Sequence, residues 1–254
     1  MNLLFEIINY YLIAQGRHGT HSPFAYDFID KCVRVHLDQK FSAKRDSLFS
    51  ELKYSNEIIT VQDFGAGSKK MGKQRGIPSI FKNSSSKGKY ADLLYRISNF
   101  YKPQKILELG TSLGVGTIHL QAGNRKSEII TVEACKETLA IAQKNFKQFD
   151  FNIKTINSTF QQYIEQLNEE KFDLIYIDGH HDGDSLLLYL EKLIPFIHND
   201  TIVLLDDIRW SNSMINAWKI ICKSEFYHVS IELLRMGLIT PRKQQTKQHF
   251  VLRY

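Results

Sequence analysis

The stretch Lys105-Ile-Leu-Glu-Leu-Gly-Thr-Ser-Leu-Gly-Val-Gly116 decides the fold of this chain. An apolar run that ends in an acid and then breaks into three glycines predicts a strand that turns directly into a helix. Glycine lets the backbone turn tightly and approach a ligand with no Cβ in the way. The spacing, Gly-x-x-x-Gly-x-Gly, differs from the Gly-x-Gly-x-x-Gly fingerprint of dinucleotide-binding proteins. The stretch therefore predicts a nucleotide pocket of another kind.

A second acid follows this stretch at the end of the next predicted strand. The residues Glu128–Val132 predict that strand, and Glu133 follows it. At this position a carboxylate can accept hydrogen bonds from ribose hydroxyls. The acid, the glycine spacing and the second acid together resemble the first motif of class I S-adenosylmethionine (SAM)-dependent methyltransferases. The resemblance implies that SAM is the cofactor and that its contacts include Glu108, Gly110, Thr111, Ser112, Gly114, Gly116 and Glu133.

From Gln104 onward, short apolar runs alternate with helical stretches, a pattern typical of buried parallel strands. The predicted strands are 106–109, 129–132, 153–156, 174–177 and 202–205, and the predicted helices are 115–122, 136–149, 160–168, 185–196 and 212–223. Five such repeats predict an α/β fold with a doubly wound sheet and right-handed crossovers. The tail adds strands at Tyr227–Leu234 and His249–Arg253. The resemblance implies that these two form a hairpin that completes a seven-stranded Rossmann-like methyltransferase sheet.

The first hundred residues have a different pattern. Helices are predicted at 3–14, 23–35, 43–53 and 90–101, with a strand at 57–61 and flexible joints at Gly65–Gly76 and Ser84–Gly88. We expect residues 1–102 to form an N-terminal helical cap that closes over the ligand end of the sheet. Residues 103–254 are then the methyltransferase domain.

Two loops in the cap region carry suggestive residues. Asp63–Lys70 also combines an acid with close glycines, but it lacks the third glycine and runs into Lys69-Lys70. A phosphate-contacting lid and a solvated connection are both open for it. His18 and His21 could hold a metal or a substrate, although a turn role for this Gly/Ser/Pro segment is favoured because no third ligand lies nearby.

In doubly wound sheets, ligands bind beyond the carboxyl ends of the strands. The third predicted strand is followed by Ser158 and Thr159, which could meet the adenine edge. The fourth ends in Asp178-Gly-His180-His181-Asp182, and the fifth ends in Asp206-Asp207. These polar residues are the expected site.

A buried strand that ends in an acid is costly unless the acid is paired, hydrogen-bonded or bound to a metal. Asp178, Asp206 and Asp207 suit Mg²⁺, which prefers oxygen ligands. The pattern resembles the metal-dependent O-methyltransferases, and Asp178–His181 is most similar to their macrocin-type sugar-modifying branch. The resemblance implies that the three aspartates hold the ion and that His181 is the general base, with Asp178 as a second catalytic residue. It also implies that Asp178 contacts SAM and that His180 lies in the wall of the SAM pocket.

Other roles remain open for several of these residues. Asp182 or Asp184 could cap the following helix. His181 could serve only as a hydrogen-bonding or structural group. Trp210 could stack on a substrate ring or close the core.

The expected reaction is methyl transfer from SAM to a hydroxyl of a small molecule with vicinal hydroxyls, a sugar or a catechol-like ring. The chain has 33 basic and 27 acidic residues, a net charge of +6, with no aromatic interleaving of the kind that binds RNA. A nucleic-acid or protein methyltransferase and a non-catalytic SAM-binding module are the alternatives. An NAD-dependent dehydrogenase is disfavoured by the glycine spacing.

Composition also sets expectations about location. No apolar run reaches the roughly eighteen residues of a membrane span. Cys32, Cys135 and Cys222 are scattered and odd in number, which favours a reducing cytoplasm over a disulfide framework. Monomer and homodimer are both compatible with the sequence.

Overall fold

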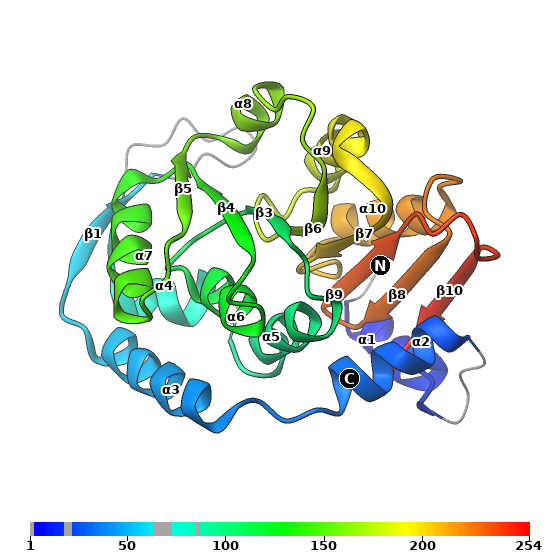
Figure 1. Ribbon diagram of the computed structural model, residues 1–254, viewed down its shortest axis with the longest axis horizontal. Coiled ribbons are helices and arrows are strands. Elements are labelled where there is room, and N and C mark those ends of the chain that lie inside the picture. The colour runs from blue at the N-terminus through cyan, green and yellow to red at the C-terminus, as the bar shows by residue number, and fades with distance from the viewer. Residues whose placement is uncertain (1–2, 18–21, 63–72, 85–86) are drawn as a thin grey trace. The chain divides into compact units, whose positions relative to one another are not determined.

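The computed structural model describes residues 3–17, 22–62, 73–84 and 87–254 (Figure 1). The chain forms two compact units. The first consists of Met1–Arg34, Lys105–Leu107 and Ile164–Tyr254, and the second of Val35–Gln104 and Glu108–Tyr163. Strand β3 and helix α8 therefore cross from one unit to the other. The division after residue 102 stays a prediction.

The second unit contains the glycine-rich stretch. Its helices are α3 (Gln39–Tyr54), α4 (Ile77–Ser84), α5 (Lys89–Tyr101), α6 (Val115–Gly123), α7 (Lys136–Gln148) and the start of α8 (Phe160–Glu165). Its strands are β1 (Ile58–Val61), β2 (Lys73–Gly76), the end of β3 (Lys105–Leu109), β4 (Glu128–Glu133) and β5 (Lys154–Asn157). Strands β4 and β5 are parallel, with Glu133 opposite Asn157.

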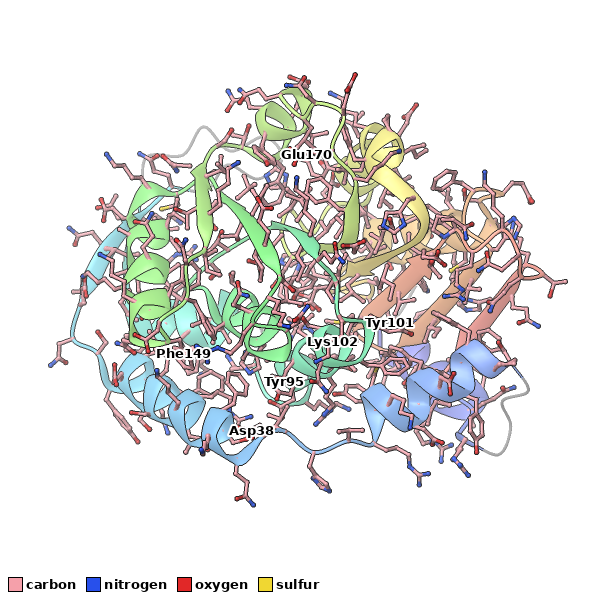
Figure 2. The ribbon with its side chains drawn as sticks, viewed as in Figure 1. Asp38, Tyr95, Tyr101, Lys102, Phe149 and Glu170 are labelled. Carbon is pink, nitrogen blue, oxygen red and sulfur yellow. The ribbon has the colours of Figure 1, made fainter. Side chains whose placement is uncertain are left out.

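A core of apolar side chains holds the second unit together. It includes Leu48 of α3, Ile77 of α4, Ile118 of α6 and Phe146 of α7. At its edge Phe41 stacks on Tyr95 with ring centroids 4.9 Å apart (Tyr95 is labelled in Figure 2). Apolar residues from helices on both sides of the glycine loop thus pack into one cluster, which fixes the helix that follows the loop.

The first unit contains the other half of the parallel strands and both described ends of the chain. Its helices are α1 (Leu3–Ile13), α2 (Pro23–Phe28), the π-helix η2 (Ile29–Val33), α9 (Gly183–Leu193), the 3₁₀ helix η3 (Ile194–Phe196) and α10 (Asn212–Lys223). Its strands are β6 (Phe172–Ile177), β7 (Ile197–Leu205), β8 (Val229–Leu233), β9 (Met236–Thr240) and β10 (Gln248–Val251). Strands β6 and β7 are parallel, with Ile177 opposite Leu205.

Among the described residues the larger sheet has the strand order β10-β8-β9-β7-β6-β3-β4-β5 (Figure 1). The chain passes from β3 to β4 and β5, and then continues at β6 and β7 on the other side of β3. This order is that of a doubly wound α/β sheet, as predicted. The seven predicted strands are present, and the eighth is β9, which was not predicted.

The predicted hairpin between Tyr227–Leu234 and His249–Arg253 is wrong. Strand β8 turns at Leu234 and Arg235 and pairs antiparallel with β9, whereas β10 runs parallel to β8. Gly237, which stands between the two predicted strands, lies inside β9. A Cβ at Gly237 would lie 2.6 Å from the ring of Trp218, so this glycine leaves room for an indole and makes no turn.

The predicted joint at Gly65–Gly76 is also partly wrong. Its last four residues, Lys73–Gly76, form β2, which pairs with β1, and helix α4 follows directly. The rest of this joint, the Asp63–Lys70 motif, His18 and His21 lie outside the described residues, as does part of the Ser84–Gly88 joint. None of the helices described is both long enough and apolar enough to span a membrane.

Candidate active site

The glycine loop of the second unit turns from β3 into α6. Gly110 and Gly114 have φ values of 112° and 80°, and Ser112 also has a positive φ of 48°. A Cβ at Gly114 would lie 2.5 Å from the ring of Phe146, so both the backbone angle and the packing require glycine there. Asn145 donates to the carbonyl of Leu113 over 2.8 Å. The loop is therefore held from α7.

Glu108 lies under this loop and is wholly buried. Its Oε2 accepts hydrogen bonds from Thr117 of α6 and from Thr131 of β4, the latter over 2.6 Å. Thr111 and Thr131 share a further bond of 2.6 Å. Burial raises the pKa of Glu108 to about 7, although the two threonine hydroxyls counteract this.

We expect Glu108 to make folding stability depend on pH. Because its pKa in the folded state lies above its ordinary value, the folded state binds a proton that the unfolded state releases. Stability should therefore fall as the pH rises from about 4.5 to about 7, by about 3 kcal/mol. Glu108→Gln should flatten this dependence in urea titrations from pH 4 to pH 8. An unchanged slope in the variant would contradict the assignment.

Glu133 ends β4 beside the same loop. Its Oε2 accepts from the backbone N–H of Ser112 over 3.0 Å, and its Oε1 accepts from that of Cys135 over 2.9 Å. Burial raises the pKa of Glu133, while these backbone donors lower it. A carboxylate can accept about four hydrogen bonds, so Glu133 keeps acceptor capacity for a ligand hydroxyl.

Two buried polar atoms of this loop have no hydrogen-bond partner among the described residues, Glu108 Oε1 and Ser112 Oγ. Buried polar atoms are rarely left unsatisfied. SAM carries hydroxyl and ammonium donors that could satisfy both, so the residues present fit this cofactor. The remaining predicted contacts, Ser158 and Thr159, follow β5. Thr159 Oγ1 caps α8 by accepting from Gln162 N, and the Ser158 hydroxyl donates to the Thr159 carbonyl.

The acidic residues of the first unit lie at the ends of β6 and β7. Asp206 N donates to the Ile177 carbonyl over 3.0 Å, which sets the two strand ends side by side. Tyr176 OH lies 3.0 Å from Asp178 Oδ2 and 3.2 Å from Asp206 Oδ2. Its single proton can be donated to one of these oxygens at a time.

Arg235, from the turn between β8 and β9, binds both aspartates of the pair. Its Nε and Nη2 lie 3.0 and 2.8 Å from the two oxygens of Asp206, and Nε lies 2.8 Å from Asp207 Oδ1. Burial alone would lower the pKa of Arg235, but the two carboxylates raise it further than burial lowers it. Burial and the charge of Asp206 raise the pKa of Asp207, against the lowering effect of Arg235 and His181.

The contacts of Arg235 involve two of the predicted metal ligands, Asp206 and Asp207. The described residues contain no group of three or more His, Cys, Asp or Glu side chains placed to hold a metal ion. Both oxygens of Asp206 and Oδ1 of Asp207 face the guanidinium of Arg235, whereas Oδ2 of Asp207 faces His181. Asp178, Asp206 and Asp207, as placed, therefore do not fit Mg²⁺.

His181 lies beside Asp207, the second residue of this pair. Its Nδ1 lies 3.6 Å from Asp207 Oδ2, and its ring lies 5.3 Å from that of Trp210. The Trp210 side chain is 62% exposed, so its predicted alternative role of closing the core is wrong. His181 is about one-third exposed and is open to a ligand.

His180 and Asp182, on either side of His181, bond to residues of helix α9. His180 has a positive φ of 58° and shares a 2.5 Å hydrogen bond between its Nδ1 and the hydroxyl of Tyr189. Asp182 caps α9 by accepting from Ser185 N over 3.0 Å, which confirms the capping alternative for that residue.

A cavity of about 370 Å³ opens beside the acidic pair. Its lining residues are Ile7, Asp207, Arg209, Trp210, Leu234 and Arg235. Both arginines are neutralised by carboxylates, so Ile7, Trp210 and Leu234 give the cavity an apolar wall with one carboxylate, Asp207, at its edge. It therefore suits a flat apolar body that carries a polar group.

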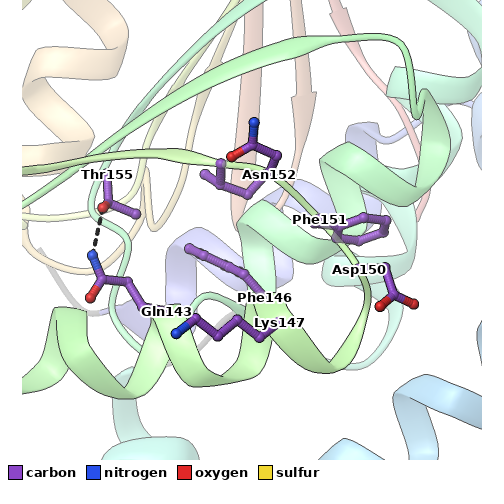
Figure 3. A pocket seen from close by; sticks show the side chains of 8 residues that line it. Gln143, Phe146, Lys147, Asp150, Phe151, Asn152 and Thr155 are labelled. Carbon is purple, nitrogen blue, oxygen red and sulfur yellow. Dashed lines mark hydrogen bonds between the residues drawn. The ribbon is translucent and has the colours of Figure 1, made fainter.

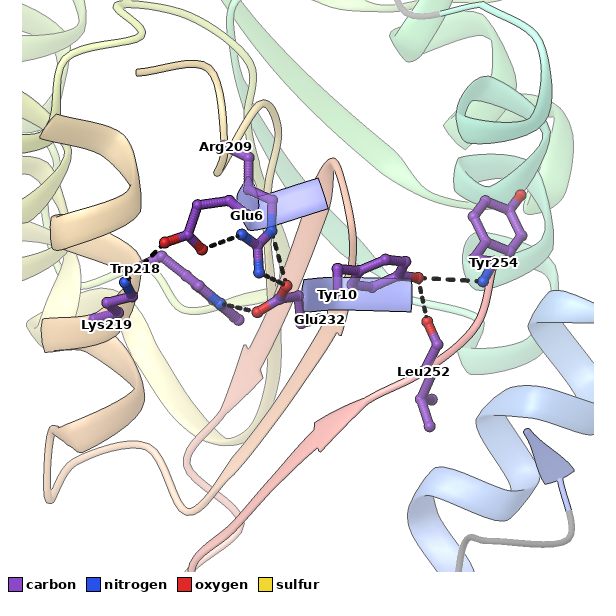
Figure 4. Close-up of polar contacts among 8 residues, drawn as sticks. All are labelled: Glu6, Tyr10, Arg209, Trp218, Lys219, Glu232, Leu252 and Tyr254. Atoms are coloured by element: carbon purple, nitrogen blue, oxygen red, sulfur yellow. Dashed lines mark hydrogen bonds and ion pairs between the residues drawn. The ribbon is translucent and has the colours of Figure 1, made fainter. Parts of the chain in front are cut away.

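Ile7 reaches this cavity because α1 is tied to the sheet by the network in Figure 4. Arg209 donates to Glu6 of α1 over 2.8 Å and to Glu232 of β8 over 2.9 Å. Glu232 also accepts from Trp218 Nε1 over 2.8 Å. Further along, Tyr10 OH donates to the Leu252 carbonyl. An N-terminal helix thus contributes one wall of the cavity.

A second hollow, of about 580 Å³, lies in the second unit between the end of α7 and β5 (Figure 3). Gln143 closes one side of it by donating to Thr155 over 2.7 Å. None of the residues predicted for the site lines it. We therefore assign it no part in the chemistry.

Part of the chain is similar to known proteins. Residues 107–208 match the family model described as "Methyltransferase domain". Over these residues the chain is similar to that family.

A curated relative of this domain is the O-methyltransferase hkm8 of Aspergillus hancockii, which is 34% identical over 116 residues. The match covers 43% of this chain and 46% of that protein, so the chain spans less than half the length of this relative.

Two solved structures share the fold. The SAH-bound methyltransferase PaMTH1 of Podospora anserina has a TM-score of 0.56 at 17% identity, covering 81% of this chain and 97% of its own. The O-methyltransferase from Bacillus cereus, in complex with SAH, has a TM-score of 0.55 at 16% identity, with 84% and 94% covered. The chain therefore shares the overall fold of these two methyltransferases.

Two residues that contact the predicted aspartates, Tyr176 and Arg235, were not predicted from the sequence. Tyr176 precedes Asp178 by two positions and therefore points to the same side of β6, a signal that alternation could have revealed. Arg235 carries no such signal, because only the pairing of β8 with β9 brings it to Asp206.

Proposed function

We propose that the chain transfers the methyl group of SAM to a hydroxyl of a small molecule. The observation that carries the proposal is the apolar cavity with Asp207 in its wall and His181 beside it. The match of residues 107–208 and the O-methyltransferase relative support the same reaction.

The second unit binds SAM in this proposal. Glu133 holds ribose hydroxyls, and the loop from Gly110 to Gly116 approaches the cofactor through its backbone. Glu108 Oε1 and Ser112 Oγ offer buried polar atoms that await partners. Bound SAM supplies a methyl group that its sulfonium already activates, so the protein's own task is to orient a nucleophile and exclude water.

The first unit binds the acceptor. Ile7, Trp210 and Leu234 contact its flat body, which favours a phenolic ring over a sugar because a sugar would leave hydroxyls unpaired against these side chains. His181 takes the proton of the attacking hydroxyl, and Asp207 stabilises the imidazolium that results. Asp178 orients the acceptor directly. The predicted Mg²⁺ has no part here because Arg235 contacts two of its three predicted ligands, Asp206 and Asp207.

A screen with labelled SAM tests the reaction. Phenols, sugars, amines, RNA and protein acceptors are offered separately, and label in a phenolic methyl ether is the expected result. Label in RNA, protein or an amine would contradict the proposal. SAM binding without transfer to any acceptor class would favour a binding module.

Glu133→Ala tests the cofactor half. We expect the variant to bind SAM about ten- to a hundredfold more weakly, because a charge-assisted acceptor of the ribose and the anchor of Ser112 are both lost. Calorimetry measures the affinity. The matched control is Glu128→Ala, which removes the same charge from the exposed opposite end of β4. Equal affinities for the two variants would refute the role of Glu133.

A further inference from the structure

Donors of the protein contact both oxygens of Asp206. Its Oδ1 accepts from Arg235 Nε over 3.0 Å and from Asp207 N over 2.8 Å. Its Oδ2 accepts from Arg235 Nη2 over 2.8 Å, with Tyr176 OH at 3.2 Å. A carboxylate offers about four such positions, two on each oxygen. A cation on Asp206 would therefore have to displace donors that the protein itself supplies.

The backbone holds Arg235 in this position. Leu234 and Arg235 form the turn between β8 and β9, and Leu234 has a positive φ of 63°. Arg235 N donates to the Leu233 carbonyl over 2.8 Å, and Ile208 N donates to the Arg235 carbonyl over 2.9 Å. The second bond ties the turn to the segment that follows Asp206 and Asp207, so the guanidinium and the two carboxylates are placed by the same anchored backbone.

The two aspartates are also enclosed. The side chain of Asp206 has no exposed surface, and that of Asp207 is 15% exposed. Two buried carboxylates need a positive charge nearby. Arg235 provides it through a planar group whose donors match both oxygens of Asp206 at once.

We propose that Arg235 is a built-in substitute for the divalent cation at this strand-end pair, and that the protein has no divalent-ion site there. The guanidinium offsets part of the negative charge of Asp206 and Asp207 and keeps Asp207 Oδ2 directed at His181. Arg235 is thus a positioning residue. The corollary that methyl transfer needs no divalent ion rests on the proposed function, whereas the absence of a cation site does not.

The test is Mn²⁺ titration of the full chain, followed by electron paramagnetic resonance of the free ion. We expect no stoichiometric Mn²⁺ binding by the wild type or by Arg235→Lys, which keeps the charge. Arg235→Ala removes the guanidinium from Asp206 and Asp207. This variant should bind one Mn²⁺ at least about tenfold more tightly than the wild type does. Arg235→Ala with Asp206→Asn should lose that binding again.

Two results would overturn the proposal. One is stoichiometric Mn²⁺ binding by the wild type that Asp206→Asn abolishes. The other is a folded Arg235→Ala chain, verified by circular dichroism, that binds no more Mn²⁺ than the wild type. If Arg235→Ala does not fold, the wild-type and Asp206→Asn titrations decide alone.

The activity corollary has a separate readout. With an acceptor identified by the screen, we expect EDTA to leave the wild-type rate unchanged, and a rate lost in EDTA and restored by Mg²⁺ would refute the corollary. Failure of every acceptor class would count against the proposed function and leave the Mn²⁺ result standing.

Discussion

Replacing His181 by Ala is expected to slow methyl transfer by about 10²–10⁴-fold, the usual contribution of a general base. His181 lies 3.6 Å from Asp207 and beside Trp210, at the edge of the proposed acceptor cavity. Without the imidazole, the acceptor hydroxyl would have to lose its proton to water during the attack. Single-turnover rates with saturating SAM measure the effect, and SAM affinity should stay within about twofold because the proposed SAM contacts lie in the second unit.

His198→Ala is the matched control. His198 is also about one-third exposed and also pairs with an aspartate, Asp173, at 3.0 Å, but it lies at the amino-terminal end of β7. We expect its removal to leave the rate unchanged. Equal losses in the two variants would point to a general effect of removing a paired histidine. An unchanged rate in His181→Ala would make His181 a structural residue.

Replacing Arg209 by Ala is expected to lower the free energy of unfolding by about 3–5 kcal/mol. Arg209 is the shared partner of Glu6 and Glu232, whose side chains are 6% and 5% exposed. Its removal leaves two buried carboxylates facing each other without the guanidinium. Chemical denaturation followed by circular dichroism measures the loss.

Lys192→Ala is the control for this loss of stability. Lys192 pairs with Glu165 on the surface of the same unit, where both side chains are substantially exposed. Such pairs contribute at most about 1 kcal/mol. If Arg209→Ala costs no more than Lys192→Ala, the network of Figure 4 does not hold α1 in place.

Local signals in the sequence were sufficient for the strands and helices around the glycine loop. Apolar runs marked β3, β4 and β6, and the helices that follow them carry the expected periodicity. These elements are long or strongly patterned, and each follows its neighbour closely in the chain.

The tail was harder to predict because its glycine had two possible meanings. Gly237 reads as a turn residue in isolation, but it lies in β9 against the indole of Trp218. The real turn is at Leu234 and Arg235, where no glycine marks the positive φ. Gly237 packs against Trp218, nineteen positions earlier in the chain, and this packing favours the hairpin of β8 and β9. Local propensity does not predict such a long-range contact.

The candidate site divides in the same way. The sequence by itself determined which acids follow the strands, since Glu133, Asp178, Asp206 and Asp207 all stand where an apolar run ends. Only the tertiary structure decided that Arg235 is the counter-charge of Asp206 and Asp207. Arg235 is close to Asp206 because β9 pairs antiparallel with both β7 and β8, which carries the turn at Arg235 to the end of β7. Strand composition predicts where a carboxylate will stand, whereas its counter-charge depends on strand pairing across the sheet, a long-range choice set by packing.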